Sequence, residues 1–197
     1  MNKRVIFLIA LSTALLMSFS VFTDSSGYPR RYWVEDIPLT IRVHESINEH
    51  EGWLDAVVDG AYQWNEVAAS YWEFDFGDFT TVSSRQQDGL NLMYFDANYD
   101  NFEPGGTVIA FSSTFTVGSG ASYHAVESDF IYNAAGFPPG VNGEPDRIDL
   151  QGTAAHEFGH HLGLGHCGDA GNDQPGLGEV FPDAVMYYAG IEGDTMT

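Results

Sequence analysis

One eleven-residue run limits what this chain can be more than any other feature. It reads His156-Glu157-Phe158-Gly159-His160-His161-Leu162-Gly163-Leu164-Gly165-His166. His156 and His160 are four residues apart, so on a helix they project from one face and can share a metal ion. Gly163 can end that helix, because glycine adopts a positive φ without steric cost, and the turn can return His166 as a third ligand. Three neutral imidazoles leave one position open, as in catalytic zinc sites, and Glu157 can act there as general base.

The first residues have the composition of a secretory signal peptide. Lys3 and Arg4 precede an apolar run from Val5 to Phe22, which small and polar residues follow. This pattern predicts a cleaved signal over residues 1–23, a mature domain over residues 24–197, and a secreted, extracellular protein. The run of 18 residues is also long enough for an uncleaved anchor, which stays an alternative.

The chain is strongly acidic. It has 7 basic and 28 acidic side chains and a net charge of −21; without Lys3 and Arg4 the net charge is −23 and no lysine remains. Such a charge repels nucleic acid and anionic lipid, so we expect neither nucleic acid nor, after signal cleavage, a membrane as a partner.

Cys167 is the single cysteine. A single cysteine excludes a disulfide within the chain, and we expect its thiol to be buried or unreactive. We also expect a monomer.

Periodicity along the chain predicts one α+β domain. Apolar residues at three- and four-residue steps predict a long amphipathic helix over Ser46–Ala69, with Ser46 and Glu49 as its capping box. A second helix, Leu150–Leu164, carries the metal-binding run. Residues 133–147, rich in glycine, proline and asparagine, predict a loop. Stretches of β-branched and aromatic residues predict strands at Leu39–Val43, Phe74–Phe76, Leu90–Phe95, Thr107–Val117 and Val126–Tyr132. We therefore expect a mixed twisted sheet with a long helix and a zinc-binding active-site helix.

The metal-binding run and three shorter segments resemble the metzincin metallopeptidases and, among them, matrixins of the bacterial type. The strongest similarity covers Ala154–His166. Weaker similarities lie at Pro104–Thr107 with Ala110-Phe111, at Glu127–Asn133 and at Ala184–Tyr187. The resemblance extends from about Pro38 to Tyr188. It implies a single metzincin-like domain.

The same resemblance implies a zinc endopeptidase. His156, His160 and His166 would bind one catalytic Zn²⁺, Glu157 would be the general base, and Met186 would form a hydrophobic floor beneath the imidazoles. An extended peptide would bind antiparallel to an edge strand near Thr107–Ser113, through main-chain hydrogen bonds. The residues expected along that strand are Thr107, Ile109, Ala110 and Phe111.

Several features depart from the matrixin pattern. We find no propeptide with a cysteine switch between the predicted signal and Trp33. Tyr188 stands where matrixins carry proline, at an offset where astacins and serralysins place a zinc-reaching tyrosine. It is therefore either a core aromatic or an oxyanion-stabilising or zinc-reaching phenol. The chain ends 11 residues after Met186, so we expect that the C-terminal helix of metzincin domains is missing and the chain truncated.

Other side chains give weaker signals. His161 follows a ligand directly on the helix, so we expect it to face solvent. His44, His50 and His124 lack partners at ligand spacing, and we assign them no metal. Calcium is a candidate second ion, because oxygen ligands suit it. Its candidate ligands are Asp96, Asn98 and Asp100 in one stretch and Asp169, Asp173, Glu179 and Asp183 in another.

These observations favour a secreted zinc-dependent endopeptidase that hydrolyses peptide bonds in extracellular proteins. Its substrates would be peptides or proteins, attacked by a zinc-activated water with Glu157 as base. A catalytically silent binding or adhesion module stabilised by zinc is the alternative. That module would bind zinc tightly without hydrolysing any peptide.

Overall fold

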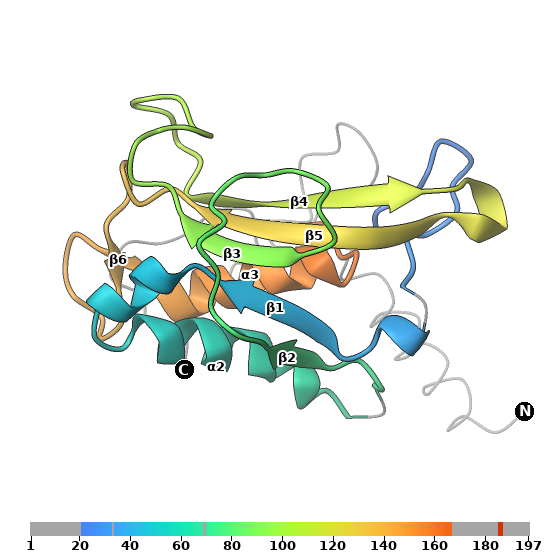
Figure 1. Ribbon diagram of the computed structural model, residues 1–197, viewed down its shortest axis with the longest axis horizontal. Helices are drawn as coiled ribbons and strands as arrows, with labels where there is room; N and C mark the ends of the chain where they lie inside the picture. The colour runs from blue at the N-terminus through green and yellow to red at the C-terminus, as the bar shows by residue number, and fades with distance from the viewer. Residues whose placement is uncertain (1–20, 33, 69, 167–184, 187–197) are drawn as a thin grey trace, which may run out of the picture.

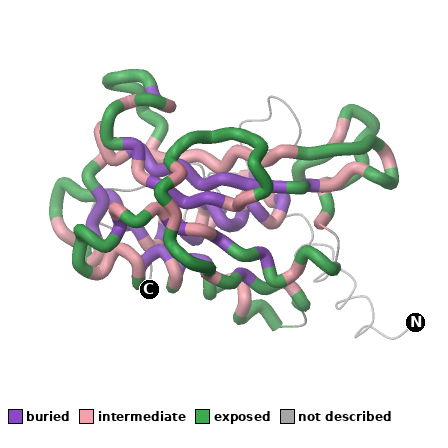
Figure 2. The backbone as a smooth tube through the Cα atoms, viewed as in Figure 1, coloured by how far each residue is buried: buried purple, intermediate pink, exposed green. Residues whose placement is uncertain are grey.

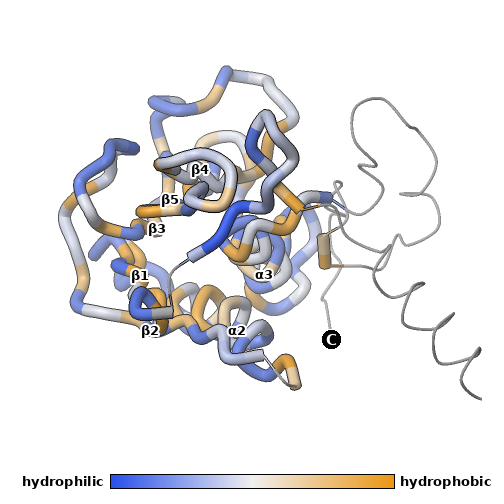
Figure 3. The backbone as a smooth tube through the Cα atoms, turned by 90° about the vertical axis from the view of Figure 1, so that its right-hand side faces the viewer, coloured by the Kyte–Doolittle hydropathy of each residue, from blue (hydrophilic) through white to orange (hydrophobic). Residues whose placement is uncertain are grey.

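The computed structural model describes residues 21–32, 34–68, 70–166 and 185–186 (Figure 1). Within them, one five-stranded sheet has two α-helices against one of its faces (Figures 1 and 3). No helix in these residues is long and apolar enough to cross a membrane. In chain order the elements are η1 (Val34–Asp36), β1 (Leu39–Val43), η2 (Glu45–Glu49), α2 (Trp53–Asn65), β2 (Phe74–Phe76), β3 (Asn91–Phe95), β4 (Ala110–Val117), η3 (Gly120–Ser122), β5 (His124–Tyr132), β6 (Pro139–Gly140), β7 (Ile148–Asp149) and α3 (Leu150–His161).

The sheet is mixed, with the strand order β2-β1-β3-β5-β4. β1 runs parallel to β2 and β3, β3 runs parallel to β5, and only β4 is antiparallel to its neighbour, β5. Helix α2 connects β1 to β2, as a crossover between parallel strands requires. β4 has one strand neighbour among the described residues and so forms an edge of the sheet. β6 and β7 pair in a separate two-stranded sheet directly before α3.

The main core lies between the sheet and the two helices. Leu39, Ile41 and Val43 alternate along β1 with more exposed residues, and all three are buried. Phe130 of β5 packs on Phe158 of α3 with ring centroids 5.6 Å apart. Each large apolar side chain buried in this way contributes roughly 1.5–3 kcal/mol. Figure 2 shows the buried layer running through the central strands.

Helices α2 and α3 approach closely because Gly60 has no side chain. A Cβ at position 60 would lie 2.7 Å from the carbonyl oxygen of Gln151 and 2.9 Å from the nitrogen of Ala155. Nearby, the indole N–H of Trp64 donates a hydrogen bond to the carbonyl of Ala155 at 2.8 Å. A larger residue at position 60 would push the helices apart, so this contact sets the position of the helix that carries the histidines.

A smaller core covers the opposite face of the sheet. Neighbouring strand residues face opposite sides; Met93 therefore belongs to the main core, whereas Leu92 and Tyr94 pack with Phe102 and Ile131. The segments before β3 and between β3 and β4, together with Phe111 of β4, supply the rest of this cluster. Both faces of the central strands are therefore buried.

The predicted α+β fold is confirmed, but one helix prediction was wrong in extent. The helix predicted from Ser46 to Ala69 is divided into the 3-10 turn η2 and helix α2. The break falls at Gly52, whose φ of 80° is left-handed. Instead of Ser46, the side chain of His44 caps the first turn by accepting from the Ser46 amide at 3.2 Å.

The predicted strand from Thr107 also starts later, at Ala110. The Asn133 side-chain amide donates to the carbonyl of Val108 and its backbone N–H donates to the carbonyl of Ile109, both at 2.9 Å. These bonds hold the chain outside the regular ladder before β4. The last predicted strand begins two residues earlier than expected, at His124, and the predicted loop 133–147 contains the two-residue strand β6.

Candidate metal centre

Helix α3 presents the first two histidines of the motif. Asp149 caps its N-terminus, because its carboxylate accepts from the amides of Gln151 at 3.2 Å and Gly152 at 3.1 Å. Twelve residues of helix follow, and His156 and His160 lie one turn apart on the same face. The fixed start and the helical period together determine where both imidazoles point.

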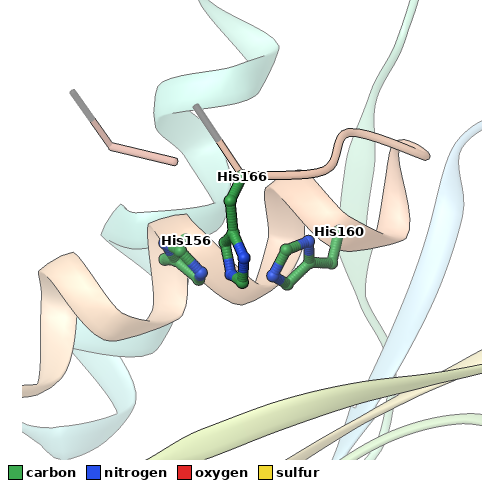
Figure 4. A group of neighbouring side chains, drawn as sticks. All are labelled: His156, His160 and His166. Carbon is green, nitrogen blue, oxygen red and sulfur yellow. The ribbon is translucent and has the colours of Figure 1, made fainter. Parts of the chain in front are cut away.

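A tight turn brings the third histidine to the other two. Gly163 has a φ of 91°, and its N–H donates to the carbonyl of His160 at 3.0 Å. The chain then reverses, so that His166 points at His156 and His160 (Figure 4). The ring centroids are 4.7 to 5.1 Å apart, and one nitrogen from each ring lies within 4.8 Å of the others. This is the one cluster of potential metal ligands found among the described residues.

Two backbone carbonyls orient the helical imidazoles. Nδ1 of His156 lies 2.7 Å from the carbonyl oxygen of Val185, and Nδ1 of His160 lies 2.8 Å from that of Leu164. A ring whose Nδ1–H donates to a carbonyl has its lone pair on Nε2. Carbonyl partners of this kind fix the tautomer of metal-binding histidines in many proteins. The donor set therefore fits a metal ion.

Burial keeps these two rings neutral. It lowers the pKa of His156 to about 4 and that of His160 to about 3, against the effect of their hydrogen bonds to carbonyls. Metal binding requires the unprotonated imidazole, so at neutral pH no proton has to leave first. Three histidine side chains are a zinc-type ligand set that leaves a fourth position for water.

Glu157 directly follows His156 on α3 and is almost completely buried. The hydroxyl of Ser112, on edge strand β4, is 2.9 Å from a carboxylate oxygen of Glu157 and 2.9 Å from its backbone carbonyl. Burial raises the pKa of Glu157 to about 8, and the Ser112 hydrogen bond opposes this rise. The arrangement places a buried carboxyl group on the same helix as His156 and His160, in contact with β4.

Met186 packs beneath the helix that carries the histidines. Its side chain is fully buried, and a Cβ at position 159 would overlap its sulfur atom. Gly159, between the two helical histidines, therefore provides the space that the methionine occupies. Its role as a hydrophobic floor beneath the imidazoles stays a prediction.

The edge-strand residues expected to bind substrate are only partly in a strand. Ala110 and Phe111 belong to β4, whereas Thr107 and Ile109 precede it. Ile109 packs against the main core. A peptide paired with β4 would therefore lie along residues from Ala110 onward.

The prediction that His161 faces solvent was wrong. Its side chain is completely buried, with ring centroids 6.3 Å from Phe74 and 5.2 Å from Phe158. Helix α3 is covered on more than one side, so the residue after a ligand also points into packed protein. Burial lowers the pKa of His161 to about 3.

The predicted calcium ligands do not form a metal cluster in the described residues. Both carboxylate oxygens of Asp96 already accept hydrogen bonds, from the amides of Asn98, Asp100 and Asn101 and from the Asn101 side chain. These donors lower the pKa of Asp96, although its burial acts in the opposite direction. Asp169, Asp173, Glu179 and Asp183 lie outside the described residues, as do Cys167 and Tyr188.

Two contacts with the motif have no signature in the sequence. Ser112 contacts Glu157, and the guanidinium of Arg30 donates a hydrogen bond to the carbonyl of His160. A serine in a strand and an arginine near the amino terminus carry no pattern that links them to a motif so distant in sequence. Both contacts arise only from the tertiary fold.

Comparison with known families agrees with this geometry. Residues 33–172 match the family model for Matrixin, within the M10 peptidases. The matched span is more than half of the 197 residues and includes all five strands of the sheet, both α-helices and the three histidines. No curated protein matches the chain.

Proposed function

Because the chain belongs to the matrixin family of zinc metallopeptidases, we propose that it is a secreted endopeptidase that cuts peptide bonds in extracellular proteins. The observation that carries this proposal is the convergence of three histidine nitrogens at the helix that also carries the buried carboxylate of Glu157. Zinc held by His156, His160 and His166 would supply an activated water and polarise the scissile carbonyl.

Glu157 would act as the general base. Its carboxylate would take a proton from the attacking water and pass it to the departing amine, which is the usual exchange in such sites. Burial raises the pKa of Glu157 to about 8, and this makes the ionised carboxylate a stronger base near neutral pH. A nearby divalent cation favours that ionised form.

Strand β4 would align the substrate with this base. It is an edge strand, and a peptide can add to such an edge through main-chain hydrogen bonds. Ser112 lies on the same strand and touches Glu157. A peptide beside β4 would therefore pass next to the proton-accepting carboxylate. This placement supports a peptide substrate over a small molecule.

The decisive experiment compares two glutamate variants on a peptide library. Zinc-loaded wild type should cleave library peptides, and a chelator should stop the cleavage. Glu157→Gln should bind zinc and lose activity by at least about 1,000-fold if it supplies both base and acid steps. Glu66→Gln, an exposed glutamate at the end of α2, should cleave like wild type. A zinc-loaded wild type that cuts no peptide would instead support the silent binding module.

Export is part of the same proposal. The apolar segment that follows Lys3 and Arg4 has the composition of a signal peptide. In an exporting host, the protein should accumulate outside the cytoplasm. Replacing several apolar residues of Val5–Leu16 by polar ones should keep it inside, and equal export of both forms would contradict the proposal.

A further inference from the structure

A hairpin near the amino terminus lies against the turn that follows the active-site helix. Thr23 pairs with Pro29, and the Asp24 side chain accepts from the amides of Ser26 and Tyr28 inside the hairpin. The second carboxylate oxygen of Asp24 accepts from the amide of Gly120 at 2.7 Å. Figure 1 shows this segment in blue beside the connection between β4 and β5. The hairpin is therefore anchored on one side to η3, in the connection between β4 and β5.

Its other side pairs with the metal-binding turn. Val21 forms an antiparallel bridge with Leu164, and the amide of Phe22 donates to the carbonyl of Gly163 at 2.8 Å. The carbonyl of Leu164 is also the group that holds Nδ1 of His160. The ring of Phe22 lies 5.7 Å from the His160 imidazole, centroid to centroid. The hairpin thus contacts both the backbone that orients His160 and the imidazole ring of His160 itself.

Arg30 is the closest link between the hairpin and that ligand. Its guanidinium donates a hydrogen bond to the carbonyl of His160 and lies over the Phe22 ring, 5.0 Å from the ring centroid. It also covers Gly163, where a Cβ would lie 3.6 Å from Nε of Arg30. No carboxylate pairs with this guanidinium among the described residues. Its charge instead faces the carboxyl end of α3, where backbone carbonyls carry partial negative charge.

We propose that Arg30 is a positioning residue for the metal site and that it fixes the turn through which His160 and His166 reach one ion. This inference rests on the proposed zinc-peptidase function. Its physical basis is that a carbonyl held by a cationic donor, and a turn held by two main-chain pairings, have little freedom to move. Outer partners of metal ligands commonly account for about 10- to 100-fold in metal affinity.

Electrostatic repulsion would have the opposite effect on zinc binding. A half-buried positive charge disfavours a second positive charge nearby, so charge alone would make Arg30 weaken zinc binding. If positioning dominates, removing Arg30 lowers zinc affinity. If repulsion dominates, removing it raises zinc affinity.

The experiment measures zinc affinity of the full chain by competition with a chromogenic chelator at neutral pH. Arg30→Met keeps the apolar stem and removes the donor, and it should weaken zinc binding by about 10- to 100-fold. Arg31→Met makes the same charge change at the adjacent residue, whose exposed side chain lies 3.4 Å from the carbonyl of Ala121. It should bind zinc like wild type.

A second variant and a spectrum separate positioning from general loss of structure. Arg30→Lys keeps a cationic donor and should recover part of the lost affinity. With Co²⁺ in place of zinc, the visible absorption of Arg30→Met should differ from that of wild type and Arg31→Met. If Arg30→Met does not fold, Arg30→Lys provides the test, and its zinc affinity should be lower than that of wild type.

Wild-type or higher zinc affinity in every folded Arg30 variant would overturn the proposal. Zinc affinity does not depend on turnover, so this outcome is distinct from a failure of the peptidase proposal. A wild type that binds zinc and cuts no peptide would refute catalysis, while the comparison of Arg30 and Arg31 would still decide the positioning role.

Discussion

The hydroxyl of Ser112 lies 2.9 Å from a carboxylate oxygen of Glu157, although 45 residues separate the two in sequence. The contact joins edge strand β4 to the active-site helix. A buried carboxylate with a single side-chain hydrogen bond depends strongly on that bond for its orientation. Ser112 therefore connects the strand that would hold the peptide with the group that would move the proton.

Replacing Ser112 by alanine should lower kcat/KM by about tenfold or more, because a hydrogen bond to a charged group is worth roughly 1.5–3 kcal/mol. The Ser112 bond lowers the pKa of Glu157, so its loss should also move the acid limb of the pH profile to higher pH. Initial rates across pH would measure both effects. Ser84→Ala, in an exposed loop, should behave like wild type, and an unchanged Ser112→Ala profile would contradict the assigned role.

His161 should make the protein sensitive to acid. Both of its ring nitrogens are buried and have no hydrogen-bond partner among the described residues, and burial lowers its pKa to about 3. The unfolded chain takes up a proton near pH 6.5, whereas the folded protein does not until far lower pH. Stability from this residue is therefore present above about pH 6.5 and is lost as pH falls towards about 3.

The test is His161→Leu, compared with wild type by urea unfolding in the presence of a chelator. At pH 5 the low pKa of His161 reduces the wild type's free energy of unfolding by about 2 kcal/mol. The free energy of unfolding of His161→Leu minus that of wild type should therefore be about 2 kcal/mol larger at pH 5 than at pH 8. His124→Leu, at a partly buried position far from α3 in sequence, serves as the control. Equal differences at both pH values would show that His161 carries no acid sensitivity.

The sequence predicted those features that depend on local periodicity. Four-residue spacing places His156 and His160 on one helical face wherever the helix packs, and a glycine at position 163 permits the turn that returns His166. The structure brings these three rings together as expected. Strand positions such as β1 and β2 were also predicted at their observed bounds, because alternation and β-branched residues mark them directly.

Features that depend on packing between distant segments could not be predicted in this way. Nothing in the residues around His161 indicates that Phe74, from the other edge of the sheet, covers its ring. The Arg30 contact spans 130 residues. The division of the predicted long helix at Gly52 depends on a left-handed φ that an amphipathic pattern does not reveal.

Asp129 should destabilise the protein at neutral and alkaline pH. Its side chain is completely buried; one oxygen accepts from the amide of Leu92 at 3.1 Å, and the other has no hydrogen-bond partner in the part of the chain that the structure describes. Burial raises its pKa to about 7, and the neighbouring Glu127 charge adds to this rise. The unfolded chain ionises near pH 4, so stability is greatest below that value and falls as pH rises to about 7.

Asp129→Asn keeps an oxygen for the Leu92 amide and cannot ionise. At pH 8 it should be more stable than wild type by up to about 4 kcal/mol, with a smaller difference at pH 4. Urea unfolding with a chelator at both pH values measures this. Asp59→Asn, exposed on α2, should show little change at either pH. Lower stability of Asp129→Asn at pH 8 would mean that the ionised carboxylate has a stabilising partner.

The pairing of Val21 and Phe22 with the turn at Gly163 and Leu164 favours a mature chain that keeps both residues. The predicted cut after residue 23 would remove them. Ser18-Phe19-Ser20 places small residues one and three positions before Val21, a pattern that signal peptidases cleave. We therefore expect Val21 as the first residue of the exported protein, which intact mass and N-terminal sequencing would determine. An exported protein that begins at Asp24, with full zinc affinity, would show that the metal site does not need the pairing of Val21 and Phe22.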